Sequence, residues 1–337
     1  MNKIRAGVVG VGLMGRLYAR LLKELPQAEL TAVFDLDAER AAGIGAELGA
    51  KASPSVEDLL NQVDAVFVCS PDRAHLEPVL AAAAAGKHVF VEKPLATNSA
   101  EGLQMVEAAE KAGIVFMVGH VLRFDPRYIH ARSAVADGDV GEVIHMFARR
   151  NTYIDQGRHY ASWTTVPWFL GIHDIDALMW ICGSPITSVY ARGVRKLLAE
   201  KGADDSVLAV FTFANGAIAG LEVSFVLPLV QGNRQSPLLE VVGSKGMIHV
   251  MPYLRGITIH KADGLVEPDP LYNMGPVMHG QIAGVYKEET VHFLRCIQEG
   301  IIPAAPGRDA LLAVAVVEAL ERSLASGKEE KVVPATA

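Results

Sequence analysis

Cysteine is scarce in this sequence, and the placement of the few cysteines excludes two kinds of site. The 337 residues include three cysteines, at positions 69, 182 and 296. They are odd in number, far apart and without CxxC spacing, so they indicate neither a disulfide framework nor a zinc site. We therefore expect no bound metal. The cytoplasm, a reducing compartment, is the location that fits this cysteine usage best.

Long apolar runs and basic clusters are also missing. No segment approaches the roughly 18 uninterrupted apolar residues of a membrane span, and the nearest is the alanine run at residues 81–85. The net charge is -7, and lysine and arginine never gather into a cluster that could neutralise a row of phosphates. We therefore expect neither a membrane nor a nucleic acid as partner.

The chain does have the composition and length of an ordinary folded protein. Half of its residues are hydrophobic and a fifth are charged, which leaves no long region too polar to fold. A length of 337 residues is more than twice the usual domain size of about 150. Two hydrophobic cores are therefore expected, and we place the domain boundary between residues 122 and 123.

The first part, residues 1–122, alternates short β-branched runs with helical stretches rich in alanine and leucine. This alternation is typical of parallel βαβ units, so the segment predicts an α/β Rossmann domain with a doubly wound parallel sheet. The expected strands are 4–9, 30–34, 65–68, 88–91 and 115–118. The expected helices are 13–25, 37–48, 56–60, 73–85 and 99–112, the last with Ser99 as its N-cap.

The second part, residues 123–337, changes to longer alternating strands, which predict an α+β domain with a large, mainly antiparallel sheet. Asn215-Gly216 lies between two such strands and predicts a two-residue hairpin turn with positive φ at both positions. The expected strands are 143–151, 187–195, 206–214, 217–226, 238–243 and 246–251. The expected helices are 126–137, 171–182, 281–299 and 308–326, and a C-terminal helix can pack back on the first domain.

The first predicted strand leads into a GxGxxG motif, Gly10-Val11-Gly12-Leu13-Met14-Gly15, which opens a helix. In this context Gly10 allows a tight turn, Gly12 allows the backbone to approach a pyrophosphate, and Gly15 allows close packing. The helix N-terminus, with Leu13 and Met14, would supply N–H groups to the phosphates. The alternative is a glycine-rich turn that binds no ligand.

Asp35 lies where the second strand ends, near the offset at which an acid accepts hydrogen bonds from an adenosine ribose. A 2′-phosphate there would be repelled, so the residue favours NAD over NADP, although Arg40 follows one helical turn later. Asp35 as a simple helix N-cap is the alternative. Asp37 is the second candidate for the ribose contact.

The chain also carries, in order, CSPD from residue 69, EKP from residue 92, GH from residue 119 and GIHDID from residue 171. Together with GVGLMG, these segments resemble in order and spacing the glucose-fructose oxidoreductase, inositol dehydrogenase and MocA family. The closing segments ETVHFLRCIQEG and GRDALLAVAVVEALERSLASGK are similar to the last helices of that family. The resemblance implies an NAD- or NADP-dependent enzyme that oxidises a secondary alcohol of a sugar or cyclitol, or catalyses the reverse reaction.

The resemblance also implies roles for residues of the first part. Lys93 would contact the substrate hydroxyl, where its ammonium stabilises developing alkoxide, unless it is an ordinary surface lysine. Glu92 would support the turn or the cofactor. Five further residues would lie by the cofactor or the substrate: Ser70, Pro71 and His75 at the cofactor, with His120 and Arg123 near nicotinamide and substrate.

In the second part, His173 is the candidate general acid and base, because imidazole titrates near neutrality. Asp176 lies three residues on, on the same helix face, and could orient the ring. A buried structural histidine is the alternative. One position departs from the family, where an aspartate usually stands four residues before this histidine: here it is Phe169. A polar residue of the preceding loop, Lys93 alone, or a lost or altered reaction would have to account for the change.

The segment 149–160 is dense in hydrogen-bond donors, and family members bring substrate contacts from this region. Arg149, Arg150 and Arg158 could bind a carboxylate or phosphate, or could form a solvated loop with a dimer contact. Tyr153 and Arg158 are predicted substrate contacts. Trp168 is predicted to stack on a sugar ring, with core or interface packing as the alternative, which also applies to Trp163.

These observations predict an NAD-dependent oxidoreductase that moves a hydride between nicotinamide and a secondary alcohol or ketone of a sugar, sugar derivative or cyclitol. We expect a small-molecule polyol or sugar as its partner, and a homodimer or homotetramer. Two alternatives stay open: NAD-assisted, redox-neutral glycoside cleavage, and an NAD-binding regulator without catalysis. Retention of Lys93 and His173 argues against the regulator.

Overall fold

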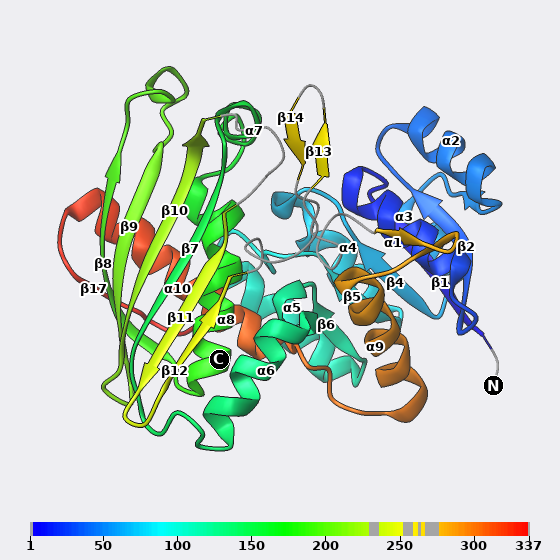
Figure 1. Cartoon of the computed structure of the whole chain (residues 1–337). Coiled ribbons are helices and arrows are strands. Elements are labelled where there is room, and N and C mark those ends of the chain that lie inside the picture. Colours follow the sequence, from blue (N-terminus) through cyan, green and yellow to red (C-terminus); the bar gives the residue numbers. More distant parts are fainter. Residues whose placement is uncertain (1–2, 229–235, 252–258, 262–263, 267–275, 336–337) are drawn as a thin grey trace. The chain divides into compact units, whose positions relative to one another are not determined.

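A computed structural model describes residues 3–228, 236–251, 259–261, 264–266 and 276–335 (Figure 1). The chain divides into two compact units. The first holds Met1–Phe124 and Leu271–Leu311, and the second holds Asp125–Pro270 and Leu312–Pro334, each over its described residues. These units are defined by packing, and the functional division at residues 122 and 123 stays a prediction.

The first unit is built around a six-stranded sheet whose strands all run parallel, in the order β3-β2-β1-β4-β5-β6. The reversal of strand order beside β1 is the point where ligands collect in doubly wound sheets. This confirms the predicted Rossmann architecture. The strands are β1 (Ile4–Val9), β2 (Ala28–Phe34), β3 (Lys51–Ala52), β4 (Ala65–Val68), β5 (His88–Val91) and β6 (Phe116–Val118).

The edge strand β3 was not predicted, because it has two exposed residues and no apolar run to mark it. The N-cap of α5 was also predicted one residue late. Asn98, not Ser99, caps this helix, and its side chain accepts the N–H of Glu101 at 2.8 Å. Both asparagine and serine suit that position, so residue type alone does not separate them.

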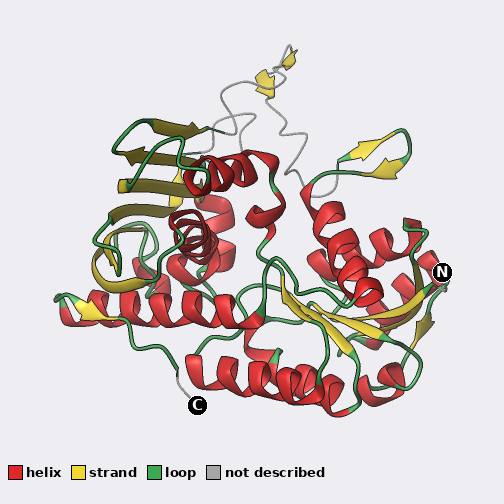
Figure 2. Cartoon of the chain, turned by 90° about the horizontal axis from the view of Figure 1, so that it is seen from below, coloured by secondary structure: helices red, strands yellow, loops and turns green. Residues whose placement is uncertain are grey.

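Helices cover both faces of this sheet (Figure 2). One group contains α1 and α9, which pack together, and the other contains α3, α4 and α5. The helices are α1 (Leu13–Glu24), α2 (Ala38–Leu48), α3 (Val56–Leu60), α4 (Leu76–Ala84), α5 (Ser99–Ala112) and α9 (Val285–Glu299). The helix predicted from residue 281 starts later, because β15 (Val277–Met278) and β16 (Gln281–Ile282) form a small hairpin before it.

An aromatic cluster fills the core between the sheet and α1 and α9. Tyr18, Phe67, Phe90 and Phe293 are fully buried, and their rings lie 4.8–5.8 Å apart between centroids. The two phenylalanines of β4 and β5 stack on each other, with the other two rings against them. This packing fixes α1 and α9 on the sheet and holds the Tyr18 hydroxyl at the strand ends.

The second unit is built around a seven-stranded sheet in the order β12-β11-β7-β10-β9-β8-β17. Its pairs are antiparallel except for β7 and β10, which run parallel, so the predicted mainly antiparallel sheet is confirmed. The strands are β7 (Val143–Tyr153), β8 (Ile186–Val194), β9 (Ser206–Phe213), β10 (Ile218–Leu227), β11 (Leu238–Gly243), β12 (Met247–Val250) and β17 (Glu330–Lys331). A separate hairpin joins β13 (Ile259–Lys261) to β14 (Gly264–Val266).

The predicted turn at Asn215-Gly216 does join β9 to β10, but its type was wrong. Phe213 accepts the N–H of Gly216 and donates its own N–H to Ala217, which gives a three-residue loop. Only Gly216 has positive φ, at 89°. The Asn215 side chain accepts the N–H of Ala217 and stabilises this longer turn.

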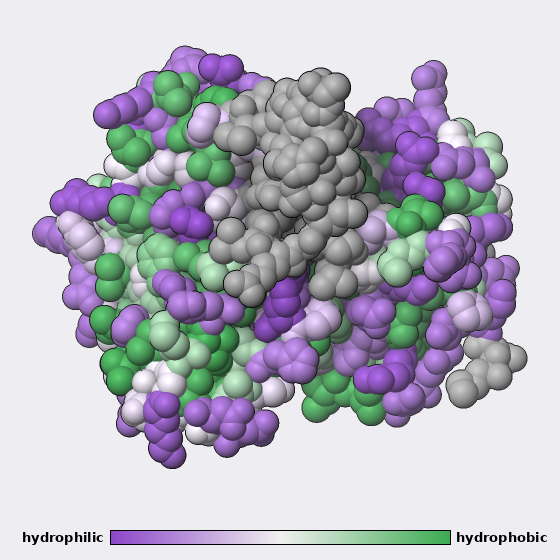
Figure 3. Space-filling model, viewed as in Figure 1, coloured by the Kyte–Doolittle hydropathy of each residue, from purple (hydrophilic) through white to green (hydrophobic). Residues whose placement is uncertain are grey.

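Helices cover one face of this larger sheet (Figure 2). They are α6 (Pro126–Ala136), α8 (Ile172–Cys182) and most of α10 (Gly307–Ser326), while α7 (Ile154–Tyr160) follows β7. The opposite face carries exposed apolar side chains such as Leu208, which is 59% exposed. Figure 3 shows hydrophobic residues mixed with polar ones over these strands.

Candidate active site

The glycine-rich loop after β1 is shaped by two glycines with no room for a side chain. Gly10 has φ of 84°, and a Cβ there would lie 2.6 Å from the backbone nitrogen of Ser70. A Cβ at Gly15 would lie 1.8 Å from the carbonyl oxygen of Gly10. The loop therefore packs tightly against β4 on one side and against the first turn of α1 on the other.

Gly12, between them, faces open space: a Cβ there would meet no atom of the described chain within 4 Å. It is also the N-cap of α1, and no side chain caps that helix. Leu13 is 73% exposed and Met14 is half-buried. An open approach to an uncapped helix N-terminus, where N–H groups and the helix dipole favour an anion, fits a dinucleotide pyrophosphate.

Asp35 follows the end of β2 and joins the loop to the next turn. One carboxylate oxygen accepts the N–H of Val11 at 2.9 Å, and the other accepts the N–H of Asp37 at 3.0 Å. Arg40 lies 3.3 Å from the same carboxylate and also pairs with Asp37. Asp37, not Asp35, is the N-cap of α2, so the capping alternative for Asp35 is wrong. Its contact with an adenosine ribose stays a prediction.

The loop after β4 is braced by His75, whose ring is buried. One ring nitrogen lies 3.0 Å from the carbonyl oxygen of Pro94, and the other lies 2.9 Å from that of Ser70. Burial lowers the pKa of His75, and the carbonyl oxygens that its two ring nitrogens face oppose this fall. The histidine therefore ties the Ser70-Pro71 loop to the turn at Lys93, and its contact with the cofactor stays a prediction.

Lys93 lies after β5 in a turn that includes the cis peptide to Pro94. Its backbone N–H donates to the Glu92 carboxylate at 3.0 Å, and the backbone of Glu92 bonds to Val68. A Cβ at Gly119 would approach the Glu92 carboxyl carbon to 3.4 Å, so the end of β6 packs against this carboxylate. Glu92 thus supports the turn, because its carboxylate accepts the backbone N–H of Lys93.

His120 and Arg123 follow β6 and are both buried. The Arg123 guanidinium donates to the carbonyl oxygen of Ala304 and to the carboxylate of Asp309, each at 2.8 Å. These bonds tie the end of β6 to the chain that leads into α10. Substrate contacts by His120 and Arg123 stay predictions.

In the second unit, His173 and Asp176 are buried on α8, one helical turn apart. Asp174, between them, forms a buried ion pair with Arg150 of β7, at 2.7 and 3.0 Å. Burial raises the pKa of Asp174, and the Arg150 guanidinium opposes that rise. Arg150 therefore anchors α8 to the sheet, which is a different role from the predicted binding of a substrate carboxylate or phosphate.

Phe169 lies in a π-helical turn, Pro167–Gly171, that leads directly into α8. Its ring stacks on Tyr160 at 3.8 Å between centroids and lies edge-on to Trp163 and near Phe225. An aromatic cluster thus takes the position where the resemblance leads one to expect an aspartate. Tyr160, the last residue of the donor-rich segment 149–160, therefore packs against Phe169.

The other predicted substrate contacts of the second unit lie at different depths. Tyr153 is buried at the end of β7, Trp168 is half-buried before Phe169, and Arg158 is exposed on α7, 3.9 Å from Asp155.

The described residues contain no group of histidine, cysteine or acidic side chains able to hold a metal ion. Among their helices none has the length and apolar character needed to cross a membrane.

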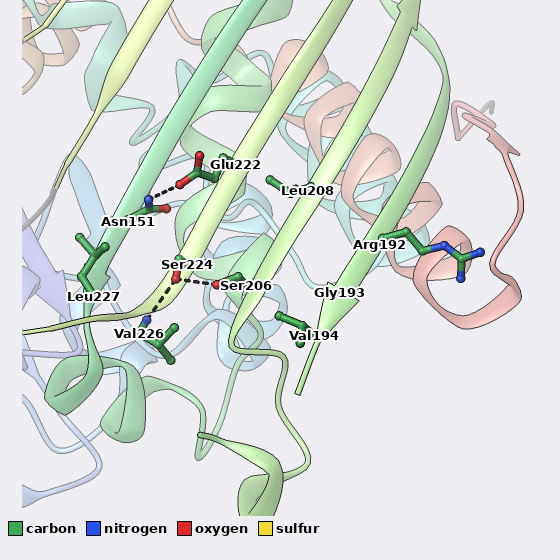
Figure 4. Close-up of a pocket in the computed structure, with 10 residues that line it drawn as sticks. All are labelled: Asn151, Arg192, Gly193, Val194, Ser206, Leu208, Glu222, Ser224, Val226 and Leu227. Atoms are coloured by element: carbon green, nitrogen blue, oxygen red, sulfur yellow. Dashed lines mark hydrogen bonds between the residues drawn. The ribbon is translucent and has the colours of Figure 1, made fainter. Parts of the chain in front are cut away.

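A shallow pocket lies elsewhere, on the exposed face of the larger sheet (Figure 4). Asn151 donates to Glu222 at 2.6 Å across β7 and β10, and Ser206 donates to Ser224 at 2.7 Å across β9 and β10. Asn151 is adjacent to Arg150 on β7, so the two side chains point to opposite faces of the sheet. The pocket is therefore on the face opposite to α8.

Comparisons with known proteins identify the family of this chain. Residues 4–120 match the model of an oxidoreductase family with an NAD-binding Rossmann fold, and residues 128–249 match the C-terminal domain of the GFO/IDH/MocA proteins. An inositol 2-dehydrogenase from Rubrobacter xylanophilus is 32% identical over 98% of this chain and 94% of its own. The chain belongs to the Gfo/Idh/MocA oxidoreductase family.

Two further proteins are similar over nearly the whole chain. A 2,7-anhydro-N-acetylneuraminate hydratase from Escherichia coli is 27% identical over 98% of this chain and 97% of its own. The crystal structure of a probable dehydrogenase from Thermotoga maritima has a TM-score of 0.82, with 27% identity over 98% of this chain and 99% of that one. The family models and the similarity to an inositol 2-dehydrogenase confirm the predicted family, NAD cofactor and oxidoreductase class, and the solved structure confirms the fold.

Sequence reasoning missed three side chains that the structure brings to these sites. Tyr18 and Glu289 meet at Glu92 although they are 271 positions apart, and Arg150, predicted to bind an anion or to lie in a solvated loop, pairs instead with Asp174. The apolar stretch around Tyr18 reads as an ordinary core face of a helix. Glu289 carries a weak signal, because it falls on the apolar side of its helix beside Val285 and Phe293.

Proposed function

We propose that this family member is an NAD-dependent cyclitol dehydrogenase, which oxidises one ring hydroxyl of an inositol to a ketone. The observation that carries the proposal is the full-length similarity to an inositol 2-dehydrogenase, joined to the retention of Lys93 and His173. NAD supplies the hydride acceptor when it is bound. Gly12 and the N-terminus of α1 would hold its pyrophosphate, and Asp35 its adenosine ribose.

Two side chains would move and hold the substrate proton. The Lys93 ammonium would donate a hydrogen bond to the reacting hydroxyl and stabilise negative charge on its oxygen. His173 would take the hydroxyl proton as the C–H bond breaks, and Asp176 would orient the imidazole. In the reverse direction the same imidazole would return the proton to the alkoxide.

The position of Phe169 would leave His173 as the proton acceptor without the neighbouring aspartate expected from the family. The stacked rings of Tyr160 and Phe169 present an apolar face, and such a face suits the axial C–H groups of a cyclitol ring. Tyr153, Arg158 and Trp168 are proposed as further contacts to ring hydroxyls or to the ring face.

A redox-neutral reaction is the second candidate, because the hydratase from Escherichia coli is similar over almost the entire chain. In such a reaction, oxidation of one substrate carbon would acidify a neighbouring C–H and allow elimination, and the oxidation would be reversed before the product is released. The same lysine and histidine would serve, and reduced nicotinamide would not accumulate.

We also propose that the exposed face of the larger sheet pairs with a second copy, in a homodimer or homotetramer. Val210, Ile218 and Met247 are about half exposed there beside Leu208, and apolar patches on a sheet face commonly mark protein interfaces. Sedimentation of Leu208→Asp beside the wild-type protein tests this: a lighter variant supports it, and identical sedimentation as a monomer contradicts it. On cysteine usage alone, we propose that the protein is located in the cytoplasm.

The substrate proposal is tested by incubating the protein with NAD or NADP and a panel of cyclitols, aldoses, sugar acids and glycosides. Reduced nicotinamide and carbon products are measured in the same samples. Reduction of NAD with an inositol, and not with glycosides, supports the dehydrogenase. Conversion of a glycoside or anhydro sugar without net reduction would instead establish the redox-neutral reaction. NAD binding with neither result would contradict both.

A further inference from the structure

Three buried polar side chains meet in the first unit directly behind the turn that carries Lys93. Tyr18 comes from α1, Glu92 follows β5, and Glu289 comes from α9. The Tyr18 hydroxyl oxygen lies 2.8 Å from one carboxyl oxygen of Glu92 and 2.6 Å from one carboxyl oxygen of Glu289. Tyr18 and Glu289 are 0% exposed, and Glu92 is 7% exposed.

The hydrogen atoms available fix how this group is bonded. A tyrosine hydroxyl has one proton, so it donates to one carboxylate and its oxygen must accept a hydrogen bond from the other group. Two ionised carboxylates on one buried hydroxyl would leave an acceptor facing an acceptor and would repel each other. One of the two carboxyl groups must therefore carry a proton.

Glu289 is the group that keeps the proton. Its second carboxyl oxygen is buried and has no hydrogen-bond partner among the described residues, whereas the second oxygen of Glu92 accepts the N–H of Lys93. Burial holds the pKa of Glu289 well above its usual range, and the charge of Glu92 adds to the rise. For Glu92, burial raises the pKa while the Lys93 charge lowers it.

Among the residues that the structure describes, no cation raises or lowers the pKa of Glu289. The titratable groups that act on it come from α1, from the end of β4 and from the end of β5: Tyr18, Cys69 and Glu92. None of them is positively charged. The nearest rings are those of the aromatic cluster described above, on which Tyr18 packs.

We propose that Glu289 is a neutral carboxylic acid that donates to Tyr18, which donates to the ionised Glu92, so that this chain of hydrogen bonds positions the turn carrying Lys93. The inference rests on the proposed role of Lys93 in the reaction. Tyr18 and Glu289 are thus positioning residues. They hold a single negative charge, on Glu92, beside the lysine and fix the carboxylate that receives the Lys93 backbone N–H.

Loss of the chain has a defined consequence for the reaction. Without a donor from Tyr18, the Glu92 carboxylate is buried with one bond fewer, so it rotates or takes up a proton. Lys93 then loses both its backbone acceptor and the charge that favours its ammonium form. Turnover falls and its pH profile shifts to lower pH, whereas the glycine-rich loop and Asp35, which hold NAD, keep their own contacts.

The test compares four variants of the full chain: Tyr18→Phe, Glu289→Leu, Glu289→Gln and Glu288→Gln. Glu288 is the matched control, because it is adjacent on α9 but exposed. We expect Tyr18→Phe to lower kcat about tenfold or more, the effect of removing a hydrogen bond to a charged group, with little change in the Kd for NAD. Glu289→Leu leaves the Tyr18 hydroxyl bonded to Glu92 but removes the group that orients it, so we expect a smaller loss of kcat in the same direction. Glu289→Gln keeps a donor for Tyr18 and recovers most of the loss.

Infrared difference spectra provide a readout that needs no turnover. At neutral pH, wild type minus Glu289→Gln should contain the C=O band of one protonated carboxyl, and wild type minus Glu288→Gln should not. Absence of that band would overturn the assignment of the proton. Equal kcat and pH profiles in wild type and Tyr18→Phe would overturn the positioning role. If wild type itself turned over no substrate while the band was present, the proposed function would fail and the protonation state would stand.

Discussion

A pair of alanine substitutions in the glycine-rich loop separates folding from cofactor binding. In Gly12→Ala the new methyl group meets no atom of the described chain within 4 Å, and the backbone φ of -67° is ordinary for alanine. Alanine is only a poorer N-cap than glycine, so we expect a loss of less than about 1 kcal/mol in the free energy of unfolding. In Gly15→Ala the methyl group lies 1.8 Å from the Gly10 carbonyl oxygen, which forces the loop and α1 apart.

The two variants should therefore fail in different ways. Gly15→Ala should lose about 3 kcal/mol or more of stability, as for an overpacked backbone contact. Gly12→Ala should stay folded but bind NAD at least about tenfold more weakly, because the methyl group occupies the approach of the pyrophosphate and hydrogen bonds to a charged group are lost. Urea denaturation and calorimetric titration with NAD measure both effects. Wild-type NAD affinity in a folded Gly12→Ala would refute the placement of the pyrophosphate.

Three further changes test other parts of the account. Asp35→Ser removes the acid and leaves Arg40 for a 2′-phosphate, so the ratio of Kd values should move at least about tenfold toward NADP; an unchanged ratio, measured by titration with both dinucleotides, would contradict the ribose contact. Arg150→Met leaves the Asp174 carboxylate buried without its cation and should cost about 3–5 kcal/mol in urea unfolding, and a cost below about 1 kcal/mol would show that the pair is dispensable. Glu289 keeps its proton in the folded chain above its ordinary pKa of 4.5, whereas the unfolded chain releases it. Wild type should therefore lose stability relative to Glu289→Gln by about 1.4 kcal/mol per pH unit as the pH rises above 4.5. Parallel curves of stability against pH for the two proteins would contradict the raised pKa.

Local patterns carried most of the information about the first unit. The run that ends in Gly10, with Gly12 and Gly15 after it, predicts a strand, a tight turn and a helix, because each glycine has its own steric reason. The strand β3 is absent from that pattern, since two exposed residues contain no periodicity to detect. The position of Asn98 beside Ser99 shows the same limit, because two good capping residues in a row cannot be ranked from sequence.

Contacts between distant segments account for what sequence did not predict. Tyr18 and Glu289 each fall on the apolar side of a helix, but nothing in the sequence brings them together until α1 and α9 pack against each other. From the sequence Arg150 looks like a substrate-binding cation, but in the fold β7 packs against α8 and Arg150 forms an ion pair with Asp174. The alternation of a strand tells which residues share a face, but not which face meets a helix. The roles of Lys93 and His173 stay predictions for the same reason.

The most direct test of hydride transfer by this protein is the absorbance of reduced nicotinamide on mixing it with NAD and myo-inositol, beside its Lys93→Ala variant. We expect steady formation of reduced nicotinamide by wild type and a loss of at least about a hundredfold in Lys93→Ala, with the Kd for NAD nearly unchanged. Turnover of Lys93→Ala at the wild-type rate, or no reduction by wild type with any cyclitol although NAD binds, would contradict it.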